Sequence, residues 1–305
     1  IEKGFNILKR NGNLIYIVPI SITSSDSMTA LHNLLEKNCR LIKISSYAVR
    51  PQPIFQNAVI NTSILFFIKT LTPVEQILCT KMYRKGKGFD LKTLLENLQF
   101  IDVRNYKLYG RYPKISLPIE TNILDKLFSI KTKTKDLIRK NGEPIYYRFA
   151  GGRYFKVVTP YKTGSSAEKI IYFDKHIANN IGAILSSNLF FWYYQIFSDN
   201  LNLKSYEIES FPIPINELSE ERIKVLEALY DDYLKDIEKN AKTRITTKYA
   251  HIDTFKEYKI GKSKKYIDAI DDFIGPLYGL NEEEIEFIKN YEIEFRLTEN
   301  EEDEN

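Results

Sequence analysis

The side chains best suited to chemistry are cations gathered in the middle of the chain. Residues 131–175 hold eleven Lys or Arg against four Asp or Glu, a charge of +7 in a 305-residue chain whose net charge is +4. Tyr and Phe are interspersed with these cations, a pattern typical of surfaces that bind polyanions. Lysines would contact phosphates as point charges, whereas an arginine can donate two hydrogen bonds to one guanine in the major groove. The alternative is an ordinary solvated surface. The DNA-contact candidates are Lys131, Lys133, Lys135, Arg139, Lys140, Arg148, Arg153, Lys156 and Lys162.

The other reactive residues form no catalytic or metal-binding pattern. Three scattered His and two Cys supply neither a metal cluster nor a disulfide framework, so we predict no metal site. Lone thiols indicate a reducing cytosol, and we expect a cytoplasmic protein. The longest apolar run, 189–194, is far shorter than the roughly 20 residues that cross a bilayer. The acids at 268, 271 and 272 are expected on a solvated helix surface.

The first third of the sequence has the pattern of an α/β sheet. The run LIYIVPI at 14–20 is almost continuously apolar, which predicts a strand buried on both faces of a parallel sheet. A helical pattern follows, then strands at 40–47 and 60–70 with a proline-bearing loop at 50–59 between them. We therefore expect the closing part of a mostly parallel sheet.

The residue pattern changes twice in the rest of the chain. A short helix is predicted at 91–100, and from 106 short aromatic runs alternate with turn signals such as Asn141–Gly142, typical of an α+β domain. A long aromatic helix, mostly core, is predicted at 176–200 and an amphipathic helix at 218–242. The predicted domains are 1–105, an α/β domain; 106–215, an α+β domain; and 216–305, a helical region. Its acidic end is expected to be disordered.

Four stretches resemble a known family. They are GFNILKRNGNLIYIVPISITSS, RPQPIFQNAVINTSILFFIK, LSSNLFFWYYQIFSDNLNLKSYEIESFPIP and YIDAIDDFIGPLYGLNEEEIEFIKNYEIEFRL. In this order they resemble the C-terminal part of adenine-specific DNA methyltransferases, above all the single-chain restriction–modification enzymes of type IIG. The resemblance implies the end of a Rossmann-like methyltransferase domain, then a target recognition domain and C-terminal helices.

The resemblance also assigns roles to residues near the first strands. Phe55 matches the family position whose ring stacks on the flipped adenine, since a base must leave the duplex to be methylated; the alternative is a core Phe. Pro19 ends a predicted parallel strand, where open α/β sheets bind ligands. Ser21 and Thr23 are candidates to line the part of the site that faces the target base. Capping of the following helix is an equal alternative role for both residues.

The family's NPPY-type tetrad does not occur in this sequence. Its donor-binding glycine loop is not found either, because Gly4 and Gly12 lie on the wrong elements. The chain begins with Ile, so we interpret it as the end of a longer protein. The resemblance implies S-adenosylmethionine as cofactor, bound mostly upstream, and Mg²⁺ only with an upstream nuclease domain. No catalytic residue is assigned within the chain.

The predicted function is sequence-specific recognition of double-stranded DNA for adenine methylation, with the N-terminal remainder of the same polypeptide as partner and no membrane. The alternative is a non-catalytic DNA specificity subunit, against which the methyltransferase-like strands argue. A third interpretation is a structural protein whose basic segment binds nothing specific.

Overall fold

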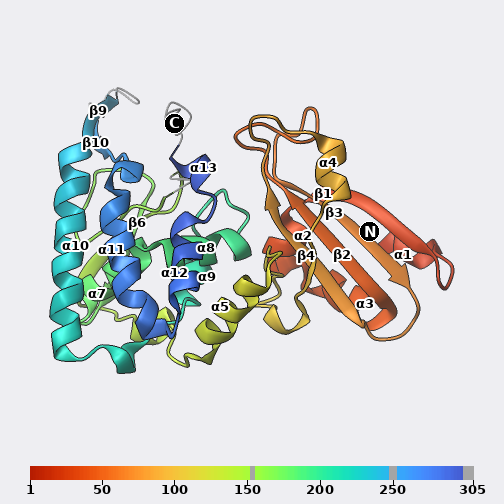
Figure 1. The fold of residues 1–305 in the computed structure, drawn as a ribbon, viewed down its shortest axis with the longest axis horizontal. Helices are drawn as coiled ribbons and strands as arrows, with labels where there is room; N and C mark the ends of the chain where they lie inside the picture. The colour runs from red at the N-terminus through yellow and green to blue at the C-terminus, as the bar shows by residue number, and fades with distance from the viewer. Residues whose placement is uncertain (152–154, 247–252, 298–305) are drawn as a thin grey trace. The chain divides into compact units, whose positions relative to one another are not determined.

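The structure, a computed structural model, describes residues 1–151, 155–246 and 253–297. The chain folds into two compact units (Figure 1). The first comprises Ile1–Leu124 and Gln195–Asp199, and the second comprises Asp125–Tyr194 and Asn200–Asn305. These units group the chain differently from the three segments expected from the sequence, because most of the expected second segment and the third fall together in one unit.

The first unit is built on a five-stranded sheet with the order β1-β3-β2-β4-β5. β2 and β4 run parallel, while β3 is antiparallel to both β1 and β2, and β5 is antiparallel to β4. The sheet is therefore mixed, whereas the sequence predicts a mostly parallel one. Its strands are β1 (Asn13–Pro19), β2 (Cys39–Tyr47), β3 (Thr62–Lys69), β4 (Gln76–Tyr83) and β5 (Ile101–Asp102). Its helices are α1 (Glu2–Ile7), α2 (Ser21–Ser24), α3 (Thr29–Asn38) and α4 (Leu91–Glu96).

Three strands of this sheet end on the same side. β1 and β2 both pair antiparallel with β3, so they point in the same direction. β4 runs parallel to β2 and therefore points in that direction too. Thr62 faces both Pro19 and Tyr47 in register, and Tyr47 faces Tyr83. We call this end of the sheet the carboxyl edge. It consists of the three strand ends and the segments that follow them, 20–25, 48–61 and 84–89.

The strand β1 differs most from its prediction. Its residues alternate between exposed and partly buried, and Ile15 and Ile17 are 61% and 60% exposed. The prediction of a strand buried on both faces is wrong because β1 lies at the edge of the sheet. Among the described residues it pairs with β3 alone.

The strand β4 has no counterpart in the sequence prediction, which expects only a helix between 73 and 105. Cys79 and Met82 point into the core, at 1% and 3% exposure. The polar residues Thr80 and Lys81 stand between them, so the segment lacks the continuous apolar run by which the neighbouring strands are recognised. Pairing with β2, more than thirty residues earlier in the sequence, holds it in the sheet.

The second unit combines small antiparallel sheets with helices, as an α+β fold does. β6 pairs with β7 on one side and β8 on the other, and β9 pairs with β10. Its strands are β6 (Glu143–Arg148), β7 (Val158–Thr159), β8 (Glu168–Phe173), β9 (Lys242–Thr246) and β10 (Asp253–Glu257). Its helices are α6 (Thr134–Leu137), α7 (Ala178–Ser186), α8 (Asn188–Phe197), α9 (Ser205–Glu209), α10 (Glu220–Asn240), α11 (Lys264–Ile274), α12 (Glu282–Asn290) and α13 (Ile293–Arg296). The helix α5 (Pro118–Ser129) and the helix α8 each pass from one unit into the other.

The aromatic stretch predicted as one long helix is two helices, α7 and α8, separated at Ser187. Its aromatic side chains form core, as predicted: Phe190, Trp192, Tyr193 and Tyr194 are fully buried. The amphipathic helix α10 begins where the sequence predicts, with Ser219 as its N-cap accepting a hydrogen bond from the main chain of Arg222. Across the described ranges, no helix is long and apolar enough to cross a bilayer.

Candidate nucleic-acid interface

The carboxyl edge of the first unit presents Phe55 on an aromatic support. The Phe55 ring is partly exposed, and its centroid lies 5.1 Å from that of Tyr47 with the two planes at 75°. Tyr47 is buried, and its hydroxyl donates a hydrogen bond of 2.8 Å to Ser45 Oγ. Burial also raises the pKa of Tyr47, so this support stays neutral. A flat ring held edge-on by a fixed neighbour can offer a face to a base.

The other residues predicted beside the target base differ in exposure. Pro19 is exposed at the end of β1, and Ser21 is partly exposed at the start of α2. Thr23 is fully buried, and its hydroxyl donates a hydrogen bond of 3.0 Å to the carbonyl of Ile20. Thr23 therefore stabilises the turn into α2 in this structure and presents no surface for a base.

Hydrogen bonds join the three segments of the carboxyl edge. The main-chain N–H of Ile20 donates to the carbonyl of Asn61 at 3.0 Å, and the Asn61 side chain accepts from the N–H of Val49 at 2.8 Å. The N–H of Ala48 donates to the carbonyl of Tyr83 at 2.9 Å. The loops that surround Phe55 are therefore connected to one another at their bases. The sequence carries no signal for these long-range bonds.

The basic candidates of the second unit divide by exposure. The exposed members, which can reach a polyanion as they stand, are Lys131, Lys135, Arg139, Lys140 and Lys162. Lys133 and Arg148 are partly buried. Lys133 donates to the carbonyl of Ile130 at 2.7 Å, and burial lowers its pKa. Arg153 lies outside the described residues.

Lys156 is the candidate whose position differs most from that of a DNA contact. It is only 4% exposed, and its ammonium lies 3.9 Å from the centre of the Tyr194 ring. A desolvated cation over an aromatic face is stabilised by the ring quadrupole, by about 2 kcal/mol. Lys156 therefore holds the segment after 154 against α8, and contact with a phosphate would require it to leave this position.

Two exposed cations, Arg139 and Lys169, are attached to the three-stranded sheet of the second unit. The N–H of Arg139 donates to the carbonyl of Tyr172 at 2.8 Å, which attaches the segment before β6 to β8. In β8, Lys169 is exposed, and its ammonium lies 5.1 Å from the centre of the Phe149 ring. The sheet thus gives a fixed base to part of the basic segment.

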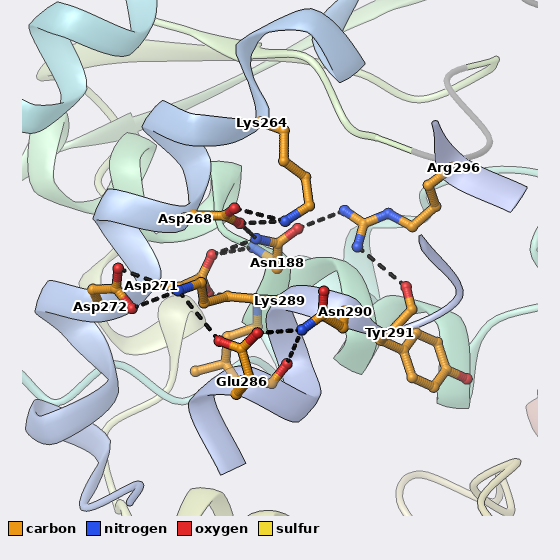
Figure 2. A network of polar contacts seen from close by, with 11 residues as sticks. Asn188, Lys264, Asp268, Asp271, Asp272, Glu286, Lys289, Asn290, Tyr291 and Arg296 are labelled. Carbon is orange, nitrogen blue, oxygen red and sulfur yellow. Dashed lines mark hydrogen bonds and ion pairs between the residues drawn. The ribbon is translucent and has the colours of Figure 1, made fainter. Parts of the chain in front are cut away.

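A buried polar network fixes the start of α8 (Figure 2). Asp271 accepts hydrogen bonds from the main-chain N–H groups of Asn188 and Leu189 at 2.9 and 3.0 Å, and from the Asn188 side chain at 2.8 Å. Arg296, 5% exposed, donates to Asn188 Oδ1 at 2.6 Å. The expectation that Asp271 is solvated is therefore wrong. It caps a helix that lies about eighty residues earlier in the chain, and sequence spacing cannot show this.

The remaining members of the acidic cluster are bound to lysines. Asp268 accepts from Lys264 at 2.6 and 2.7 Å, and Asp272 accepts from Lys289 at 3.0 Å. Within the part of the chain that the structure describes, no group of three or more His, Cys, Asp or Glu is arranged to hold a metal ion.

The two glycines near the start of the chain pack closely against neighbouring side chains. A Cβ on Gly4 would lie 2.5 Å from the Tyr16 hydroxyl and 2.9 Å from Leu14, so this glycine permits α1 to pack on β1. A Cβ on Gly12 would lie 2.9 Å from the Leu8 side chain. At both positions the space that a Cβ would take is occupied by the protein's own side chains.

No protein-family profile matches the chain, and no curated protein matches it in sequence. Among solved structures, the type IIL restriction–modification enzyme MmeI in complex with DNA is similar, with a TM-score of 0.47 and 11% identity over 94% of this chain and 50% of that chain. The ATP-dependent type ISP restriction–modification enzyme LlaBIII bound to DNA is similar over 50% of this chain and 11% of that chain, with a TM-score of 0.28 and 13% identity. This chain spans about half the length of the MmeI chain.

Proposed function

We propose that this chain recognises double-stranded DNA within an adenine-specific DNA methyltransferase of a restriction–modification system. The observation that carries the proposal is the carboxyl edge, where Phe55 is held on Tyr47 at the end of three strands that point in the same direction. Ligands of open α/β sheets bind at this end of the strands. The sequence resemblance assigns a base-stacking role to the same Phe55.

Methylation of an adenine amino group requires the base to leave the duplex, at a cost of a few kcal/mol. Stacking on an aromatic side chain recovers about 1–3 kcal/mol of this cost. In the proposal, Phe55 provides that face, and the exposed Pro19 ends another strand at the same edge of the sheet. The exposed and partly exposed cations between 131 and 162 bind the duplex, lysines through phosphates and arginines through guanine edges.

The methyl donor is proposed to be S-adenosylmethionine, held by another part of the enzyme, because the sequence resemblance implies that the donor-binding loop lies upstream of this chain. The open edge of β1 supports such a partner. Its main-chain groups have no described strand beside them, and Ile15 and Ile17 are exposed on one face. An exposed apolar edge strand pairs readily with another strand. We propose that the remainder of the methyltransferase sheet pairs there, with Mg²⁺ required only if that remainder includes a nuclease.

A non-catalytic DNA specificity subunit is the second candidate, because no NPPY-type tetrad occurs in this sequence. The two functions differ at Phe55. A specificity subunit receives no extruded base, so it would bind a duplex equally well whether or not an adenine within its site is paired.

The proposal is tested by selecting bound duplexes from a randomised library with the purified chain. We expect enrichment of one short sequence that contains adenine. Replacing Arg148 with Gln is expected to relax the preference at one base pair by about 5- to 150-fold, the 1–3 kcal/mol of a bidentate contact. Arg222→Gln, which removes an exposed arginine from α10, is the matched control and should leave the selected sequence unchanged. Recovery of no enriched sequence would refute the proposal.

A further inference from the structure

We infer that the segment 84–89 and Arg50 form a second DNA-backbone site, on the carboxyl edge beside Phe55. The inference rests on the proposed function and adds to it, because the basic candidates recognised in the sequence all lie between 131 and 162. The ligand is the phosphate backbone that flanks the extruded base.

The topology brings the two parts of this site together. β2 and β4 are parallel neighbours that end in register at Tyr47 and Tyr83. The N–H of Ala48 donates to the carbonyl of Tyr83 at 2.9 Å, so the segments that follow the two strands begin side by side. One of them carries Arg50 and Phe55, and the other carries Arg84, Lys85 and Lys87.

Arg84 fixes the distance between the segments. Its guanidinium donates to the carbonyl of Arg50 at 3.3 Å and to Gln195 Oε1 at 3.0 Å. Gln195 belongs to the same unit and is buried. Arg84 therefore acts as a positioning residue, which leaves Arg50, Lys85 and Lys87 to meet the ligand.

These three cations differ from lysines on an ordinary mixed-charge surface. Arg50 and Lys87 are exposed, and Lys85 is partly exposed. Gly86 and Gly88 flank Lys87, and Gly88 has a φ of +71° with open space where a Cβ would lie. A glycine-bearing turn of this kind lets a phosphate approach the main chain closely.

The charge of the carboxyl edge is of one sign. Segments 20–25, 48–61 and 84–89 contain four cations and no carboxylate. The acids that follow them are engaged elsewhere. Asp26 lies 3.6 Å from the Arg111 guanidinium, and Asp90 caps α4 by accepting from the N–H and hydroxyl of Thr93 at 2.8 and 2.6 Å. Clustered cations beside an aromatic face, on segments that hold no acid of their own, suit a nucleic-acid backbone.

The test is the salt dependence of binding to a labelled 30-base-pair duplex of random sequence. The double variant Lys85→Gln/Lys87→Gln is compared with wild type. Each phosphate contact contributes about 0.9 to the slope of log affinity against log salt, so the variant should have a slope shallower by about 1.8. Arg50→Gln alone should lower the slope by about 0.9.

The matched control is Lys37→Gln/Arg40→Gln. It removes two exposed cations from the same unit at the end of α3 and the start of β2, the opposite end of the sheet. We expect it to keep the wild-type slope. Suppose that wild type binds with a steep slope and that the Lys85/Lys87 variant and the Lys37/Arg40 variant lower this slope by the same amount. This inference is then wrong, and the proposed function stands. If wild type shows no salt-dependent binding, the proposed function itself fails.

Discussion

The buried arginine at the end of the described chain allows a quantitative prediction. The Arg296 guanidinium lies 4.4 Å from the ring centres of both Phe155 and Phe191. It donates to Asn188 Oδ1 at 2.6 Å and to the carbonyl of Tyr291 at 3.3 Å (Figure 2). The change Arg296→Ala therefore releases α13, the segment around Phe155 and the start of α8 at once.

The magnitude follows from these contacts. A hydrogen bond to a charged group contributes about 1.5–3 kcal/mol. Contact of a desolvated guanidinium with aromatic rings adds about 2 kcal/mol. Burial of the charge, which lowers the pKa of Arg296 to about 10, offsets part of both. We expect Arg296→Ala to lower the free energy of unfolding of the second unit by about 3 kcal/mol, at the upper end of the 0.5–3 kcal/mol typical of single substitutions.

The assay is urea unfolding followed by tryptophan fluorescence. Trp192 is the only tryptophan of the chain and is fully buried in α8, so it reports on the second unit. With slopes of about 1–3 kcal/mol per molar urea, the midpoint should fall by about 1–3 M. Arg222→Ala is the control, since Arg222 forms an exposed pair with Glu217 at 3.3 Å that contributes less than about 1 kcal/mol. Equal midpoints for the two variants would refute the reasoning.

Two further predictions concern titration and thiol chemistry. Burial raises the pKa of Asp271 to about 7, so between about pH 4 and 7 the folded chain holds a proton that the unfolded chain has released. The free energy of unfolding should fall as pH rises through this window, by up to about 1.4 kcal/mol per unit, and Asp271→Asn should flatten the profile; an identical profile in both proteins would contradict the assignment. Burial also raises the pKa of Cys39 to about 11 and that of Cys79 still further, so a thiol reagent at pH 8 should label both cysteines in urea and neither in the native protein. Rapid labelling of the native chain would show that these thiols are accessible.

Local sequence patterns predict several elements well. The apolar, β-branched runs at 40–47 and 60–70 correspond to β2 and β3, and the apolar stripe of 218–242 corresponds to α10. These signals are local, because side-chain spacing along one segment determines them. Strand direction and order are not local. The mixed order of the sheet depends on which segments pair, so β1 has the composition of a central strand and yet lies at an edge.

The candidate site shows the same division. Composition alone identifies the basic segment, and five of its candidates are exposed. The burial of Lys156 depends on Tyr194, almost forty residues further along the chain, and the cap on α8 depends on Asp271. The support of Phe55 by Tyr47 likewise requires the loop at 48–61 to fold back over the end of β2. Contacts between distant segments decide each of these positions, and spacing in the sequence does not report them.

The account depends most directly on Phe55 as the acceptor of an extruded base. The decisive measurement compares affinities for two duplexes of the selected sequence, one with its adenine paired and one with the same adenine mismatched. A base that is already unpaired is cheaper to extrude, so wild type should bind the mismatched duplex more tightly. Phe55→Ala should weaken binding to the mismatched duplex by about 5- to 150-fold, the 1–3 kcal/mol of one stacked base. Phe100→Ala, which removes a partly exposed ring elsewhere in the same unit, should leave it unchanged. Equal affinity of wild type for both duplexes, with no effect of Phe55→Ala, would contradict the account.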